Sequence, residues 1–266
     1  AERSQRTREL AQAGNIREVP NLESMLEEAD LILSILVPSQ AEGVAQSVAD
    51  AMRATGISRP FADCNAVSPD TSRRLETIIT SAGGDYIDGG IIGSSPAKGA
   101  EPRFYTSGPH AGVMDELDGQ GIAVRNVGGE AGRASSVKMC YASFTKGTSA
   151  LQVAMMTAAQ SLGIYDELAA ELTSSQPENL SRMEGNVPRL PSNAGRWIGE
   201  MEEIAATFDS AGVTPHFHLG AAEIFRLLES TPFSQESPET VDRSRSLADT
   251  IKVVAEYLPA NLETAD

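Results

Sequence analysis

The sequence predicts a two-domain protein, with a parallel α/β domain at residues 1–128 and an all-α domain at residues 129–266. Short apolar segments of strand length alternate with helical segments through the first half, as expected for a parallel sheet covered by helices. After Gly132, helical segments follow one another to the end with no strand between them. A chain of 266 residues with 41% hydrophobic residues can build two ordinary cores.

The strands expected in the first domain are short and apolar. Residues 30–36, DLILSIL, form a continuous apolar run between Asp30 and Pro38, which suits a strand buried on both faces. Further strands are expected at residues 60–66, 85–92, 103–107 and 122–127.

Capping residues mark the ends of the helices. Asn21 and Ser68 are good N-caps, Pro69 suits a first helical turn, and Gly56 suits a helix C-terminal end. The helices expected in the first domain span residues 1–13, 22–29, 40–55 and 69 to about 83. Those of the second domain span residues 133–162, 164–174, 176–186, 192–211, 216–229 and 237–258.

The charge balance limits the classes of partner. With 21 Lys and Arg against 37 Asp and Glu, the formal net charge is −16, which argues against nucleic acid and anionic membranes as partners. Two cysteines form no disulfide framework, no signal peptide pattern is visible, and no apolar run approaches the ~20 residues of a membrane span. We therefore expect a soluble, cytoplasmic protein.

The most informative stretch is residues 128–147, GGEAGRASSVKMCYASFTKG, where a glycine-rich turn runs into a long apolar helix. Lys138 lies in this helix between small and apolar neighbours. A buried lysine is costly unless it is paired or its pKa shifts. Lys138 is therefore either a core-helix residue that extends its ammonium to the surface or a partly desolvated acid/base group.

The domain order and this stretch resemble the β-hydroxyacid dehydrogenase family, which includes 6-phosphogluconate dehydrogenase and 3-hydroxyisobutyrate dehydrogenase. The family's catalytic motif is G-x-x-G-x-G-x-x-x-K-x-x-x-N, and Gly129, Gly132 and Lys138 match it at the right spacing. Ala134 replaces the third glycine and Ala142 replaces the asparagine. The resemblance implies a Rossmann-like NAD(P)-binding domain, a helical C-terminal domain, and Lys138 as the catalytic general acid/base.

The resemblance also implies a substrate site for a small hydroxy acid or its carbonyl counterpart. The family's substrate loop is matched loosely after Asp88 by Gly93, Ser94 and Ser95, whose backbone N–H groups and hydroxyls can bind a carboxylate. Tyr141 lies one turn after the lysine and can reach part of the missing asparagine's space. Lys146 either adds positive charge near an acidic substrate or belongs to a polar helix flank.

Cofactor contacts are implied at two strand ends. The apolar strand ending in Leu36, Val37 and Pro38 matches the family's nicotinamide side, and Asn65 follows the next strand, where it contacts the ribose or caps the strand end. Arg3 and Ser4 lie where an NADP enzyme holds the 2′-phosphate, although solvated helix-start residues fit equally well. The cofactor implied is NADP or NAD.

The glycine fingerprint G-x-G-x-x-G that cradles the pyrophosphate is not visible in this sequence. We expect roughly 30 residues of a first βαβ unit to lie upstream, and we expect the chain as written to bind dinucleotide poorly. Two alternatives stay open: an imine reductase on the same scaffold, and a nucleotide-binding protein that has lost catalysis.

Two expectations concern the second domain. His216 and His218 lack the partners of a metal site, so we expect no bound metal there and interpret them as packing residues at a helix start. The long apolar helix has too few polar faces for a monomer, which predicts a homodimer built on the helical half.

Overall fold

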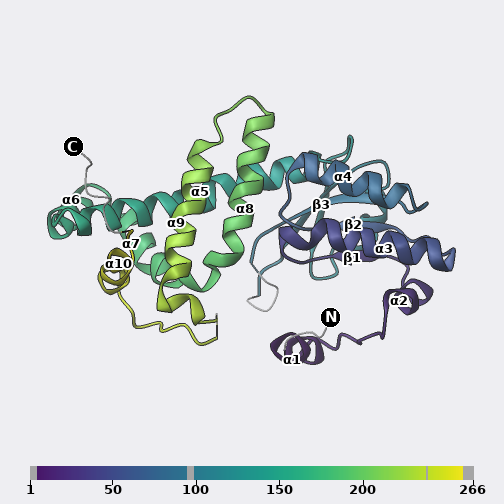
Figure 1. Ribbon diagram of the computed structural model, residues 1–266, viewed down its shortest axis with the longest axis horizontal. Coiled ribbons are helices and arrows are strands. Elements are labelled where there is room, and N and C mark those ends of the chain that lie inside the picture. Colours follow the sequence, from purple (N-terminus) through teal and green to yellow (C-terminus); the bar gives the residue numbers. More distant parts are fainter. Residues whose placement is uncertain (1–4, 95–98, 238, 260–266) are drawn as a thin grey trace.

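The computed structural model describes residues 5–94, 99–237 and 239–259, which form an α/β half and a helical half side by side (Figure 1). The helix α5 (Arg133–Ser161) runs from the sheet into the helical half and joins the two. The arrangement confirms the predicted order of an α/β region followed by helices.

The α/β half contains a five-stranded sheet in the order β1-β2-β3-β4-β5. Its strands are β1 (Ile32–Ser34), β2 (Phe61–Asp63), β3 (Tyr86–Ile92), β4 (Arg103–Ser107) and β5 (Ala123–Asn126). Its helices are α1 (Gln5–Ala13), α2 (Leu22–Glu28), η1 (Pro38–Gln40), α3 (Ala41–Thr55), α4 (Pro69–Thr80) and η3 (Ala111–Leu117).

One expectation about the sheet needs correction. Strands β1, β2 and β3 are parallel, as predicted, but β4 runs antiparallel to β3, and β5 is parallel to β4. The cause is the connection from β3 to β4, residues 93–102. Parallel neighbours need a crossover of a dozen or more residues, usually with a helix, and this connection is too short for one.

The two faces of the sheet are covered differently. Alternate residues such as Phe61 and Tyr86 pack against α3 and α4, while Ala62, Ile87 and Phe104 pack with η3 on the opposite face. Leu33, on the edge strand β1, remains 39% exposed. Strand β1 is therefore one of the two edge strands of this sheet, and it exposes an apolar side chain.

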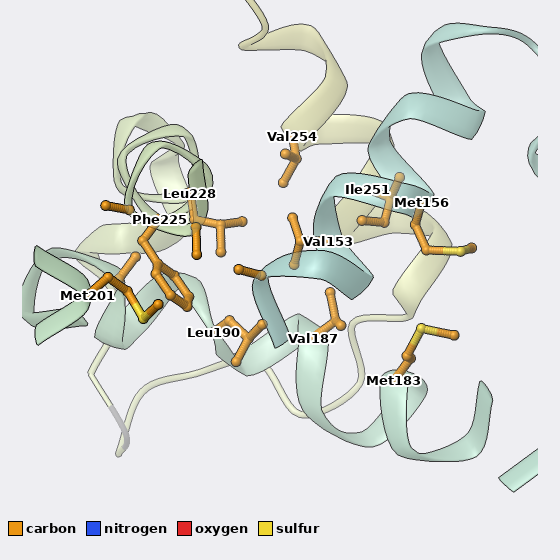
Figure 2. Close-up of a cluster of buried hydrophobic side chains, with 14 of the residues drawn as sticks. Val153, Met156, Met183, Val187, Leu190, Met201, Phe225, Leu228, Ile251 and Val254 are labelled. Atoms are coloured by element: carbon orange, nitrogen blue, oxygen red, sulfur yellow. The ribbon is translucent and has the colours of Figure 1, made fainter. Parts of the chain in front are cut away.

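The helical half is built around the apolar length of α5. Its other elements are α6 (Tyr165–Ser175), α7 (Pro177–Asn186), η4 (Val187–Arg189), α8 (Pro191–Ser210), α9 (His216–Ser230), η5 (Pro232–Gln235) and α10 (Leu247–Glu256). Val153 and Met156 of α5 meet side chains from the surrounding helices in one buried cluster, which Figure 2 shows. The labelled contributors from the other helices are Met183, Val187, Leu190, Met201, Phe225, Leu228, Ile251 and Val254.

The last predicted helix is shorter than residues 237–258. Helix α10 begins at Leu247, and Ser246 caps it by accepting a hydrogen bond from the Asp249 amide. Before it, the Ser237 amide donates to the Thr240 hydroxyl. Side chains that bond to nearby backbone in this way compete with helix formation, which explains why the helix starts late.

No helix in the described ranges is long and apolar enough to cross a membrane.

A row of buried polar residues crosses the sheet. The register pairs Ser34 with Asp63, Asp63 with Asp88, and Asp88 with Ser107, so these four side chains share one face. All four are at most 4% exposed. Burial raises the pKa of Asp63 to about 7, opposed mainly by the hydrogen bonds from Asn65.

Asp88 fastens α5 to the sheet. Its Oδ2 accepts hydrogen bonds from the backbone amides of Gly132 and Ser135 at 2.9 and 3.0 Å, and from the Ser107 hydroxyl at 2.7 Å. Its Oδ1 accepts from the hydroxyls of Ser135 at 2.5 Å and Ser72 at 2.9 Å. A carboxyl group at a helix N-terminus satisfies amides that have no partner within the helix. This contact fixes where α5 leaves the sheet.

We expect Asp88→Asn to lower the free energy of unfolding by roughly 2 to 4 kcal/mol. Asparagine keeps the size of the side chain, but it replaces one of the two Asp88 oxygens with an NH₂ group. This NH₂ group would face hydrogen-bond donors. Urea titrations of the wild type and the variant measure the difference. Asp50→Asn is the matched control, because this carboxylate is exposed and its partners, Arg53 and Gln46, lie on the same exposed helix face; we expect less than about 0.5 kcal/mol there. Equal effects of the two changes would contradict the role assigned to Asp88.

Candidate active site

Lys138 lies near the start of α5, directly over β3. A Cβ atom added to Gly90 would lie 2.9 Å from the Lys138 Cβ and 3.2 Å from the Ala134 carbonyl oxygen, so glycine is what allows this close packing. The Lys138 ammonium donates to the carbonyl oxygen of Ile91 at 2.5 Å. The lysine therefore turns back onto the sheet near the end of β3 instead of extending into solvent.

The environment of Lys138 lowers its pKa to about 8. Burial is the largest cause, since it disfavours the charged form, and the positive charges of Lys146 and Arg196 act in the same direction. Glu200 opposes them. A lysine with this pKa exchanges its proton in mildly alkaline solution, which suits a general acid/base.

A group of charged residues lies between α5 and α8. Lys146 of α5 forms an ion pair with Glu200 of α8, and the two side chains are only 13% and 8% exposed. Arg196 approaches the other Glu200 oxygen at 3.7 Å. The Lys146 ammonium also lies 5.6 Å from the centre of the Trp197 ring. We call Lys146, Arg196 and Glu200 the charge cluster.

The predicted substrate loop begins beside Lys138, because Ile91 precedes Gly93 by two residues. Gly93 has a φ of +127°, which L side chains rarely adopt, and Ser94 is exposed. Ser95 lies outside the described residues. Tyr141, one turn along α5 from Lys138, is 47% exposed and its hydroxyl has no hydrogen-bond partner among the described residues. Lys138 therefore lies beside the start of the predicted substrate loop, and Tyr141 is exposed to solvent.

Residues predicted for the cofactor side lie at the ends of β1 and β2. Asn65 is 3% exposed; its Oδ1 accepts from the Leu36 amide at 2.6 Å, and its Nδ2 donates to Ser34 and Asp63. Asn65 therefore links the ends of β1 and β2 through hydrogen bonds. Of the two roles considered, a ribose contact and a strand-end cap, this is the cap. Val37 is 40% exposed. Arg3 and Ser4 lie outside the described residues.

A groove follows the open edge of β1 and has a volume of about 560 Å³. It is mainly apolar and includes Leu36 and Val37, and such a surface suits the flat face of an aromatic ring. Its remaining lining residues are Leu22, Met25, Ile32, Leu33, Ser34, Ile35, Gln40, Val44, Val48 and Phe61. No glycine-rich helix N-terminus for a pyrophosphate is among them, so the described residues fit the rings of a dinucleotide and not its phosphates.

Several important positions were not apparent from the sequence. Asp88, matched loosely to a substrate motif, is instead fully buried under α5. Glu203 of α8 reaches across to the α/β half, where it accepts hydrogen bonds from the Ser68 amide at 2.6 Å and the Thr71 hydroxyl at 2.9 Å. Ala142, at the asparagine position, is 2% exposed within the helical core. For Glu200 and Glu203, the only signal in the sequence was their spacing of three residues, which places both on one side of a helix.

His218 is a packing residue, as expected, whereas His216 is exposed. His218 is 4% exposed, and its ring meets those of Phe208 and Phe217 at 4.3 and 5.3 Å between centroids. In the part of the chain that the structure describes, no group of three or more His, Cys, Asp or Glu could hold a metal ion.

Sequence comparisons identify part of the helical half. Residues 159–228 match a family model described as "Domain of unknown function (DUF1932)". An uncharacterized 28.5 kDa protein in the 7S RNA 5′ region of Methanothermus fervidus is 26% identical over 166 residues. The match covers 62% of this chain and spans 62% of the length of that relative.

Solved structures with the same fold cover most of the chain. A conserved hypothetical protein from Sinorhizobium meliloti 1021 is 22% identical, with a TM-score of 0.67 over 95% of this chain and 83% of that one. The conserved protein MTH1747 of unknown function, described as structurally similar to 3-hydroxyacid dehydrogenases, is 28% identical, with a TM-score of 0.59. The match covers 85% of this chain and 84% of that one. The 3-hydroxyisobutyrate dehydrogenase of Mycobacterium tuberculosis, solved with L-serine, is 16% identical, with a TM-score of 0.56. That match covers 88% of this chain and 82% of the dehydrogenase.

By its Rossmann-like domain, its helical C-terminal half and the order of the two, the chain shares the fold of MTH1747 and of 3-hydroxyisobutyrate dehydrogenase.

Proposed function

We propose that the protein is an NAD(P)-dependent oxidoreductase that acts on a small hydroxy acid or its carbonyl counterpart. The observation that carries the proposal is Lys138, a desolvated lysine with a pKa of about 8 at the junction of the two halves. Its position agrees with the acid/base lysine of the family that the motif resembles. The fold shared with 3-hydroxyisobutyrate dehydrogenase supports the reaction class.

The bound nicotinamide cofactor would accept or supply the hydride. In the oxidation direction, the neutral Lys138 amine takes the proton of the substrate hydroxyl as the C–H hydride leaves the same carbon. In the reverse direction, the Lys138 ammonium returns the proton to the carbonyl oxygen. The Ile91 carbonyl holds the lysine nitrogen in place between turnovers.

Substrate and cofactor would meet at the end of the sheet near Lys138. The backbone of Gly93 with Ser94 and Ser95 would bind the substrate carboxylate, and Tyr141 is free to donate a hydrogen bond. Leu36, Val37 and Pro38 would contact the nicotinamide side of NADP or NAD. The groove lacks a phosphate cradle among the described residues, so we expect weak binding of either dinucleotide to this chain.

We expect Lys138→Met to reduce turnover by about 100- to 10,000-fold, the usual contribution of general acid–base catalysis. Methionine keeps the length and apolar body of the side chain, so the fold and cofactor binding should persist. Initial rates with hydroxy acids, carbonyl acids and both cofactors measure the effect. Lys252→Met, at an exposed position on α10, is the matched control and should retain full activity.

The pH profile gives a second readout. Since oxidation needs the neutral amine, its rate should rise with pH and level off above about 8, whereas reduction should slow above the same pH. Undiminished turnover in Lys138→Met would show that another group transfers the proton. Turnover of imines without turnover of hydroxy or carbonyl acids would favour the imine reductase alternative, and cofactor binding without any turnover would favour the non-catalytic one.

We also propose a homodimer formed through the helical half. Phe144, Leu151 and Phe217 are 73%, 56% and 53% exposed on neighbouring faces of α5 and α9. Beside them lies a hollow of about 250 Å³. Besides Leu151 and Phe217, it is lined by Gly147, Ala150, Ala154, Gly220, Ala221 and Ile224. Projecting aromatic rings beside a shallow apolar hollow suit a twofold interface, in which each copy fills the other's hollow.

We expect the wild type to have the mass of a dimer and Phe144→Glu to have the mass of a monomer, because the new charge would be buried at the interface. Size-exclusion chromatography with light scattering measures both, and circular dichroism checks that the variant is folded. Ile16→Glu replaces an apolar side chain of similar exposure, 67%, far from α5 and should leave the mass unchanged. A monomeric wild type would rule out this interface.

A further inference from the structure

The charge cluster contains a buried ion pair that packing alone does not explain. The chain has only four lysines, Lys98, Lys138, Lys146 and Lys252, and two of them lie on α5 with most of the side chain withdrawn from water. Removing an ion pair from water costs several kcal/mol per ion, and apolar residues of similar size often serve stability as well or better. Buried charges near a candidate acid/base group therefore suggest an electrostatic role.

The Lys146 ammonium is held in place from two sides. Glu200 pairs with it from α8, and the Trp197 ring lies 5.6 Å away. Glu200 has a second cation, Arg196, at 3.7 Å from its other oxygen. Lys146 follows Lys138 by eight residues, roughly 12 Å along the helix and about 80° around it. A positive charge fixed at this position is close enough to act on Lys138.

Among the described residues, no carboxylate pairs directly with the Lys138 ammonium. Its hydrogen-bond acceptor is the Ile91 carbonyl of β3, which carries no net charge. The charged groups that act on it are Lys146 from its own helix and Arg196 and Glu200 from α8. Asp88 of β3 is occupied at the N-terminus of α5 by its five donors. The charge cluster is therefore the main electrostatic partner of Lys138.

We propose that Lys146, held by Glu200, is a positioning residue whose fixed positive charge favours the neutral, proton-accepting form of Lys138, while Glu200 limits this effect. The catalytic meaning of this inference rests on the proposed function, but the electrostatic coupling does not. Lys146 has a larger influence on the pKa of Lys138 than Glu200 has, and burial contributes more than either.

The coupling can be measured without substrate. Reductive methylation with ¹³C-formaldehyde labels the four lysines, which keep their charge, and NMR follows each resonance with pH; Lys138→Arg assigns the signal of interest. We expect Lys146→Met to raise the pKa of Lys138 by on the order of half a pH unit, because a nearby positive charge is lost. Glu200→Gln should lower it, and the double variant should fall between Lys146→Met and the wild type.

Lys146→Arg is the matched control, since it keeps the charge and changes the shape. If Lys146→Arg shifts the pKa as much as Lys146→Met, or if Lys146→Met leaves it unchanged, the inference is wrong. Should Lys146→Met fail to fold, Arg196→Gln tests the same coupling, because this side chain is 54% exposed and its loss should raise the pKa by a smaller amount. The predicted shifts without any turnover would uphold the coupling and reject the proposed function.

Discussion

The position of the candidate site depends on the contact between Asp88 and the N-terminus of α5. The carboxyl group lies in a row of buried polar side chains across the sheet and accepts the amides with which the helix begins. This contact fixes both the point and the direction in which α5 leaves the sheet. Lys138 follows the capped turn by about one helical turn, so its approach to β3 is a consequence of the same contact, assisted by Gly90.

The polar row also explains why the α/β half tolerates so many buried oxygens. The carboxyl groups of the row are paired with a neighbour in register, as Asp88 is with Ser107, or with a strand-end residue, as Asp63 is with Asn65. The buried Thr106 hydroxyl of β4 is an exception, with no hydrogen-bond partner among the described residues. A buried polar group is costly only when it lacks a partner. The sheet therefore carries the groups that hold α4 and α5, and the groove along β1 remains largely apolar.

Much of the fold follows from local signals in the sequence. The caps at Asn21 and Ser68, the glycine at Gly56 and the alternation of apolar segments locate most helices and strands to within a few residues. The direction of β4 was not predictable from periodicity, because a short strand has the same pattern in either direction. Helix α10 was overextended because local hydrogen bonds such as that of Ser237 are invisible to apolar periodicity.

The candidate site was only partly predictable, for a related reason. The glycine spacing before Lys138 is a local pattern, and it located the lysine correctly on the first turns of the long helix. Glu200 and Glu203 are contributed by α8, more than 50 residues further along the chain, and nothing in their own neighbourhood distinguishes them from a solvated helix face. Their partners are set by how the two halves pack.

The proposed function requires that Lys138 lie where the cofactor and the substrate meet. Titration of the ¹³C-methylated protein with NADPH, NADH and a series of hydroxy acids tests this most directly. We expect the Lys138 resonance to shift while that of Lys252, on the exposed face of α10, stays constant. A Lys138 resonance that responds to no cofactor and to no hydroxy acid would contradict the account.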